Sequence, residues 1–114
     1  MSKYMFLFRG GMDMKTASPE QMQANMMKWK NWMDLLTANG RMLAGEPLDG
    51  GGRVLTGRAR KITDGPFAES KEVVGGYLIV DAKTIDEAAE LSNSCPVFEH
   101  DGSVEVRAVR EMSM

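Results

Sequence analysis

The hydrophobic positions along the chain change their period several times, and each change indicates a different element. Residues Lys3 to Arg9 contain an unbroken apolar run from Tyr4 to Phe8, with no polar alternation. Val73 to Val80 forms a second run of this kind. A strand that is apolar on both sides is normally covered on both faces of its sheet. These two segments are therefore predicted to be the central strands.

A long helix is predicted between these strands. Ser18 is a suitable N-cap, Pro19 suits the first helical position, and Gln21 completes a capping box with Ser18. Asn39 and Gly40 end the helix, because Gly40 tolerates the left-handed conformation of a helix C-terminus.

The apolar residues of this helix recur at steps of three and four, so they form one continuous stripe. They are Met22, Met26, Trp29, Met33 and Leu36. Met27 and Trp32 lie off the stripe. We expect these two side chains to face a second apolar surface, such as a pocket wall or a partner subunit.

The remaining strand signals are weaker. Arg41 to Leu48 fits a short strand or an extended segment, and Arg53 to Ile62 alternates weakly. We interpret Arg53 to Ile62 as an edge strand with room for a bulge at Gly57. Ser103 to Val109 alternates cleanly between apolar and polar residues, which predicts a half-solvated strand.

A second helix is expected after Thr84, an N-cap with Glu87 as its capping-box partner, and Pro96 ends the helical region. The resulting order predicts an α+β fold, a ferredoxin-like βαββαβ sandwich with an antiparallel sheet. Its two helices can cover only one face of the sheet. A second copy of the chain is expected to cover the other face, so we predict a homodimer.

Length, composition and charge limit the classes of protein to which this chain can belong. A length of 114 residues favours a single domain spanning residues 1–114, and 43% apolar with 26% charged residues is an ordinary globular composition. No apolar run is long enough for a membrane span. A net charge of -2 argues against nucleic-acid binding. The single cysteine, Cys95, and the lack of a signal-peptide pattern predict a cytoplasmic protein.

The sequence carries no recognisable cofactor or metal motif. The glycines before Arg53 lack the Gly-Lys-Ser/Thr ending of a P-loop, so we expect a flexible turn rather than a cofactor site. One histidine and one cysteine do not make a zinc site, and no metal is predicted. Cys95 is expected to be buried and inert.

Two carboxylates are the candidate proton carriers. Glu46 and Asp64 flank segments that should meet at the open end of the sheet. A general acid or base usually needs partial burial, so at least one of them is predicted to be buried without a lysine or arginine partner. The alternative is that Asp64 caps its own turn and that Glu46 pairs with an arginine such as Arg58.

Four further side chains are candidates for contacting a small-molecule ligand: Trp32, Arg58, Tyr77 and His100. Trp32 would form the floor of an apolar pocket, and Arg58 would bind an anionic group. Each has a simpler alternative, namely core packing for Trp32, a solvated edge strand for Arg58, and a solvated loop for His100.

The segment Asp64-Gly65-Pro66-Phe67, followed by Gly75-Gly76-Tyr77, resembles the signature of the DGPF branch of the YCII-related proteins. The resemblance implies a dimeric α+β barrel. In better-understood YCII-related members a histidine of the first helix and an aspartate near its end resemble an acid–base pair. These positions fall on Trp29 and Ala38 here, and neither side chain can transfer a proton.

Two functions remain open at this point. The first is a small enzyme that uses acid–base chemistry on an apolar or aromatic metabolite, with Glu46 or Asp64 as the proton carrier. The second is a non-catalytic ligand-binding or regulatory interaction module. The second follows from the resemblance, because DGPF-type domains are associated with extracytoplasmic-function sigma factors.

Overall fold

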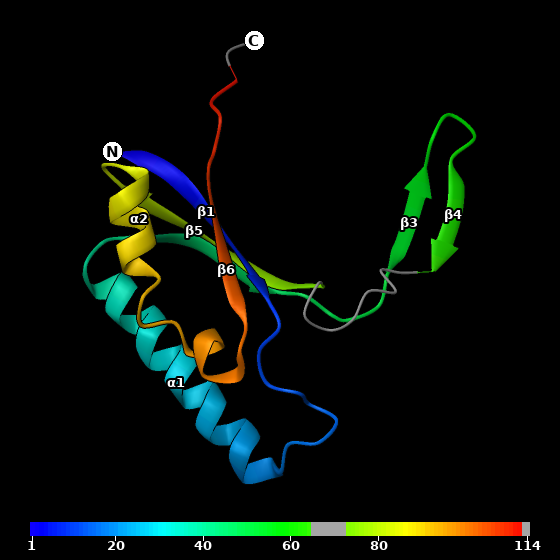
Figure 1. Cartoon of the computed structure of the whole chain (residues 1–114). Coiled ribbons are helices and arrows are strands. Elements are labelled where there is room, and N and C mark those ends of the chain that lie inside the picture. Colours follow the sequence, from blue (N-terminus) through cyan, green and yellow to red (C-terminus); the bar gives the residue numbers. More distant parts are fainter. Residues whose placement is uncertain (65–72, 113–114) are drawn as a thin grey trace.

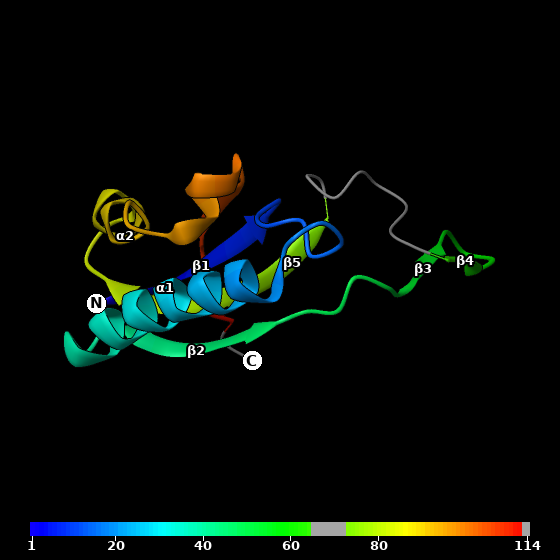
Figure 2. The same cartoon turned by 90° about the horizontal axis from the view of Figure 1, so that it is seen from below.

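The fold comes from a computed structural model, which describes residues 1–64 and 73–112. Within these residues the chain forms a four-stranded antiparallel sheet with two α-helices packed on one face (Figure 1, Figure 2). The elements are β1 (Ser2–Arg9), α1 (Pro19–Ala38), β2 (Met42–Pro47), β3 (Arg53–Thr56), β4 (Lys61–Asp64), β5 (Val74–Ala82), α2 (Ile85–Leu91), the 3₁₀ turn η1 (Pro96–His100) and β6 (Ser103–Ala108). The strand order β2-β5-β1-β6 is that of a ferredoxin-like βαββαβ fold, which confirms the predicted class.

The two apolar runs are the central strands, as predicted. β1 lies between β5 and β6, and its Phe6 is directly opposite Leu78 of β5. Tyr4, Phe6 and Phe8 point toward the helices and are buried, whereas Met5 and Leu7 on the other face are only half-buried. The helices therefore cover one face of these strands, and the second apolar face lies open in the single chain.

The predicted edge strand is wrong. The edge position beside β5 belongs to β2, and β3 and β4 pair only with each other in a separate two-stranded sheet. Gly45 allows β2 to approach β5 closely, because a Cβ atom at Gly45 would lie 2.9 Å from the Tyr77 carbonyl oxygen. The Leu48 N–H donates to the Gly75 carbonyl at 2.9 Å. This bond joins the two ends of the inserted β3–β4 segment.

Helix α1 begins as predicted. The Ser18 hydroxyl accepts from the Gln21 N–H, and the Gln21 side chain accepts from the Ser18 N–H, so the capping box is complete. The buried face is nevertheless rotated from the predicted stripe, since Trp32 is 4% exposed and Met26 is 68% exposed. The Trp32 indole N–H donates to the Leu91 carbonyl at 3.1 Å, which satisfies its polar atom inside the core.

Helix α2 begins at its predicted N-cap, where the Thr84 hydroxyl accepts from the Glu87 N–H. The Glu87 carboxylate, however, accepts from the Arg41 guanidinium at 2.6 Å and from the Lys83 N–H at 3.4 Å. An ion pair to the segment before β2 thus replaces the predicted capping box.

Two glycines, Gly75 and Gly76, lie within β5, and a neighbouring backbone approaches closely at only one of them. A Cβ atom at Gly76 would lie 3.1 Å from the Glu46 carbonyl oxygen, whereas the nearest atom at Gly75 is 4.0 Å away. Gly65, Pro66 and Phe67 of the DGPF-like sequence lie outside the described residues. None of the helices in the described ranges is long and apolar enough to cross a membrane.

Candidate functional site

An apolar hollow lies between α1, the loop after β1 and the adjoining ends of β2 and β5. Its volume is about 540 Å³. Five methionines line it, namely Met12, Met14, Met22, Met26 and Met33, together with Phe8, Trp29, Tyr77 and Leu78. We call it the methionine cleft. Methionine side chains are flexible and polarisable, so such a lining adapts to ligands of different shape.

Trp29 forms a rigid wall of this cleft. Its ring meets Phe8 edge-to-face at a centroid distance of 5.0 Å and meets Trp32 at 5.7 Å. Trp32 in turn stacks on Phe6 at 6.3 Å. The aromatic cluster therefore fixes the orientation of Trp29, while the methionines around it can move.

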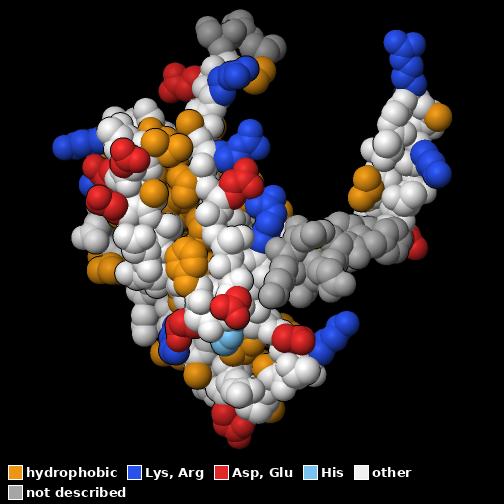
Figure 3. Space-filling model, viewed as in Figure 1, with side chains coloured by type: hydrophobic (Ala, Val, Ile, Leu, Met, Phe, Trp, Pro, Cys, Tyr) orange, Lys and Arg blue, Asp and Glu red, His pale blue; other side chains and the backbone are white. Residues whose placement is uncertain are grey.

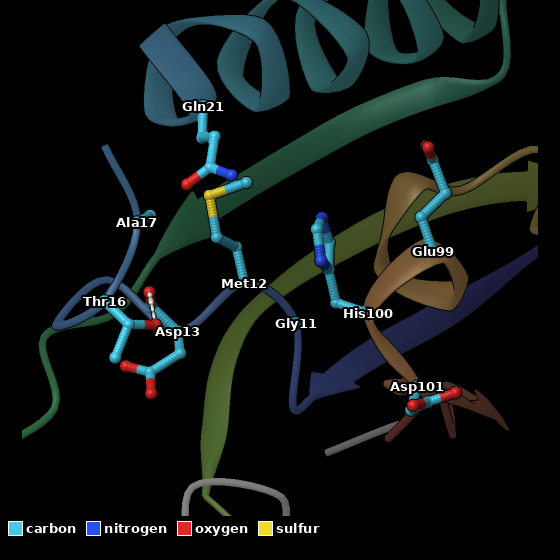
Figure 4. Close-up of a pocket in the computed structure, with 9 residues that line it drawn as sticks. All are labelled: Gly11, Met12, Asp13, Thr16, Ala17, Gln21, Glu99, His100 and Asp101. Carbon is cyan, nitrogen blue, oxygen red and sulfur yellow. Dashed lines mark hydrogen bonds between the residues drawn. The ribbon is translucent and has the colours of Figure 1, made fainter. Parts of the chain in front are cut away.

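A second, polar hollow of about 440 Å³ adjoins the cleft and shares Gly11 and Met12 with it. We call it the polar hollow. Figure 4 shows the His100 imidazole pointing into it, toward the side chains of Met12 and Gln21. The neighbouring Glu99 also lines the hollow, and its carboxylate pairs with Lys28 at 2.6 Å. His100 is exposed and lines this hollow together with three carboxylates, Asp13, Glu99 and Asp101.

The loop that carries His100 is held against the end of β1 by glycines. A Cβ atom at Gly10 would lie 2.9 Å from the Cα of Gly102. Because Gly10 has no side chain, the backbone after β1 can therefore contact the backbone at Gly102. The Gly102 N–H also donates to the Val97 carbonyl at 3.0 Å, closing η1. This close packing places the Gly11–Met12 segment beside His100.

The structure brings some of the predicted site residues together and separates others. Glu46 and Tyr77 are paired across β2 and β5 and border the methionine cleft, but the strand register places their side chains on the sheet face away from the helices. His100 lines the polar hollow. Arg58 and Asp64 lie on the separate β3–β4 hairpin, away from both hollows (Figure 1).

The predicted burial of a carboxylate is not found. Asp64 has a 75% exposed side chain and lies 3.2 Å from the Arg53 guanidinium. Glu46 is also exposed in the single chain. Trp32 is a core residue and does not floor the cleft, because the rotation of α1 places Trp29 there instead. The structure therefore favours the simpler alternative for Trp32.

Sequence reasoning missed Met12 and Met14, which follow β1 in a loop without periodicity. The signal that was available is their number, since the chain has 11 methionines and five of them line one cleft. In the described part of the chain, no three His, Cys, Asp or Glu side chains are grouped to hold a metal ion.

Cys95 is buried beneath η1, at 3% exposure. Burial raises the pKa of its thiol from the usual 9.0 to about 11. A backbone hydrogen bond with Val97 lowers this pKa, but its effect is smaller than that of burial. The thiolate is the nucleophilic form, so Cys95 stays protonated and inert at neutral pH, as predicted.

This raised pKa makes stability depend on pH in the alkaline range. Above pH 9 the unfolded chain loses the Cys95 proton while the folded chain keeps it until about pH 11. The free energy of unfolding should therefore fall over this interval, by at most about 1.4 kcal/mol per pKa unit. Urea denaturation at pH 8 and pH 10 should show a larger loss for the natural chain than for Cys95→Ala. Equal losses in the two proteins would contradict the assignment.

Comparison with known proteins identifies the family. A model of the YCII-related domain matches residues 3–113. The chain belongs to the YCII-related family. No curated protein sequence matches this YCII-related chain.

The fold of the YCII-related chain is similar to a solved structure of 5-chloro-2-hydroxyhydroquinone dehydrochlorinase from Burkholderia phenoliruptrix, in complex with 2,5-dihydroxybenzoquinone. The TM-score is 0.52 and the sequence identity 17%, over 96% of this chain and 95% of that chain. At this identity the similarity concerns the fold.

Proposed function

We propose that this YCII-related chain binds a small apolar or aromatic molecule in the methionine cleft. The main support for this proposal is the lining of the methionine cleft, in which five thioethers and the rigid ring of Trp29 surround a cavity of about 540 Å³. This volume lies within the range of about 300–1,000 Å³ that is typical of small-molecule sites. The complex of the similar dehydrochlorinase with a benzoquinone supports a small cyclic ligand.

The fixed and mobile parts of the cleft suit a planar ligand. Trp29 offers an aromatic surface held in place by Phe8 and Trp32. Met26 and Met14 are 68% and 58% exposed at the cleft, so they can close over a bound molecule and lose contact with water. Burial of these apolar side chains would contribute to affinity.

A second candidate function is acid–base chemistry on this ligand, with His100 as the proton carrier. The observation that favours it is the position of the imidazole in the polar hollow, which shares Gly11 and Met12 with the methionine cleft. Histidine is the residue most often used for proton transfer in enzymes. Of the two predicted carboxylates, Glu46 borders the cleft, although its pairing with Tyr77 places its side chain on the sheet face away from the helices.

The finer family assignment is also a proposal. The Asp64-Gly65-Pro66-Phe67 sequence, followed by Gly75-Gly76-Tyr77, supports membership of the DGPF branch. A binding module and an enzyme would share the methionine cleft and differ in the need for His100. His100→Ala should leave ligand affinity unchanged in both cases and abolish turnover only in the enzyme.

Neighbouring methionines of α1 provide a matched test of the cleft. Met26 lines the cleft, whereas Met27 is similarly exposed, at 50%, and does not line it. Met26→Glu should weaken binding of substituted hydroquinones and benzoquinones about tenfold or more, because a carboxylate would be buried against an apolar ligand. Met27→Glu should change affinity by less than about twofold.

Isothermal titration calorimetry and saturation-transfer NMR on the two variants and the natural chain measure this difference. Both substitutions are at exposed helix positions, so both variants should fold. Absence of binding by the natural chain across this ligand set, or an equal loss in both variants, would refute the proposed site.

A further inference from the structure

The β3–β4 hairpin, residues 53–64, stands away from the rest of the chain (Figure 1, Figure 2). We call it the hairpin arm. Every residue of its two strands is exposed. The radius of gyration is 15.8 Å, whereas a compact chain of this length has a value of about 13 Å. A lone two-stranded hairpin is marginally stable at best in water, so the arm needs a surface to pack against.

One face of the arm is built for packing. Leu55 and Ile62 are directly opposite each other across the two strands. Their exposed fractions are 58% and 62%, which is high for large aliphatic side chains. The Arg53–Asp64 ion pair, at 3.2 Å, borders them on the same face. The opposite face carries the facing pair Val54 and Thr63 and is more polar.

The four-stranded sheet leaves an apolar face open in the same chain. The register aligns Tyr77 with Leu7, and Ile79 with Met5, on the side away from the helices. All four side chains are half-buried. Glu105 of β6 pairs with Leu7, and Glu46 of β2 pairs with Tyr77, so these two glutamates flank Leu7 and Tyr77 across the sheet. Strands that are apolar on both sides are normally covered on both faces.

The charges of the arm and of the rest of the chain are opposite. The arm carries Arg53, Arg58, Arg60 and Lys61 against Asp64, a net charge of +3. Because the whole chain carries -2, the remainder carries -5. Figure 3 shows cationic side chains along the projecting arm and most acidic ones on the body. Electrostatic attraction therefore favours contact between the arm of one copy and the body of another.

We propose that the hairpin arm is a dimerisation arm. In a homodimer that joins the open sheet faces of two copies, the Leu55–Ile62 face of each arm packs against the body of the other copy. A two-fold axis makes this exchange reciprocal, so one interface covers both the arms and the open sheet faces. We choose a second copy of the chain as the binding partner for two reasons. Its sheet face would cover the open apolar face of the first copy, and its acidic body would attract the basic arm.

The two faces of the arm provide a matched experiment. Leu55→Asp with Ile62→Asp changes the apolar face, and Val54→Asp with Thr63→Asp introduces the same charges on the reverse face. Analytical ultracentrifugation should show a dimer for the natural chain. The first double variant should raise the dimer dissociation constant about a hundredfold, and the second by less than about threefold. A monomeric natural chain, or an equal effect of the two double variants, would overturn the proposal.

Cross-linking locates the contact directly. A photoreactive amino acid in place of Ile62, in a mixture of ¹⁵N-labelled and unlabelled chains, should yield cross-links between a labelled and an unlabelled copy. Cross-links confined to single chains would overturn the exchange of arms. Since the arm lies outside the core, circular dichroism should show that every variant keeps the fold. Neither measurement depends on ligand binding, so the result is independent of the proposed function.

Discussion

Phe6→Ala should lower the free energy of unfolding by about 3–5 kcal/mol, the typical loss for a fully buried phenylalanine. Phe6 is 0% exposed and lies at the centre of the core. It stacks on Trp32 and meets Phe8 edge-to-face, with centroid distances of 6.3 Å in both cases. Removal of the ring would leave a cavity that these neighbours cannot fill without moving.

Phe98→Ala is the matched control, because the Phe98 ring is 46% exposed. Urea denaturation followed by far-UV circular dichroism should give a much smaller loss for this variant. The comparison also concerns the site, since Phe6 supports Trp32, which in turn contacts Trp29 in the wall of the methionine cleft. Similar losses for the two substitutions would show that Phe6 is not central to the core.

Gly102→Ala is expected to destabilise the chain by about 1–3 kcal/mol or more, the usual cost of overpacking. A Cβ atom there would lie 2.7 Å from the Arg9 carbonyl oxygen and 2.8 Å from the Val97 carbonyl oxygen. Both are backbone atoms, so the contact is not relieved by a rotamer change. The loop must shift, and His100, two residues before Gly102, must shift with it.

Gly50→Ala is the control for this substitution, since no atom lies within 4 Å of a Cβ at Gly50. Its effect should stay within about 0.5 kcal/mol. Thermal unfolding measures the stability of both variants, and the NMR signals of the His100 imidazole report the position of the loop. A Gly102→Ala variant with natural stability and unchanged His100 signals would refute the described packing.

The central strands and the start of α1 were predictable because their signals are local. The apolar runs around Phe6 and Val80 are apolar on both sides, and the Ser18 capping box depends on residues three positions apart. The edge strand was not predictable in this way. Its identity depends on Gly45, whose missing side chain permits pairing with a strand more than thirty residues further along the chain.

The site shows the same division between local and distant causes. Steps of three and four along α1 allow either Trp29 or Trp32 to face the core. In the structure Trp32 is buried and donates a hydrogen bond to the Leu91 carbonyl, 59 residues away in sequence, while Trp29 is partly buried against the same core. The apolar character of the cleft was expected, whereas the contribution of Met12 and Met14 depends on a loop path that no periodic pattern describes.

The bond between the Leu48 N–H and the Gly75 carbonyl separates two parts of the chain. It joins β2 and β5 at the point where the chain leaves the four-stranded sheet toward β3 and β4. Residues 53–64 contribute nothing to the lining of the methionine cleft, so substitutions confined to them would leave that lining unchanged. On the two proposals made above, assembly and ligand choice would therefore be determined by different residues of the same chain.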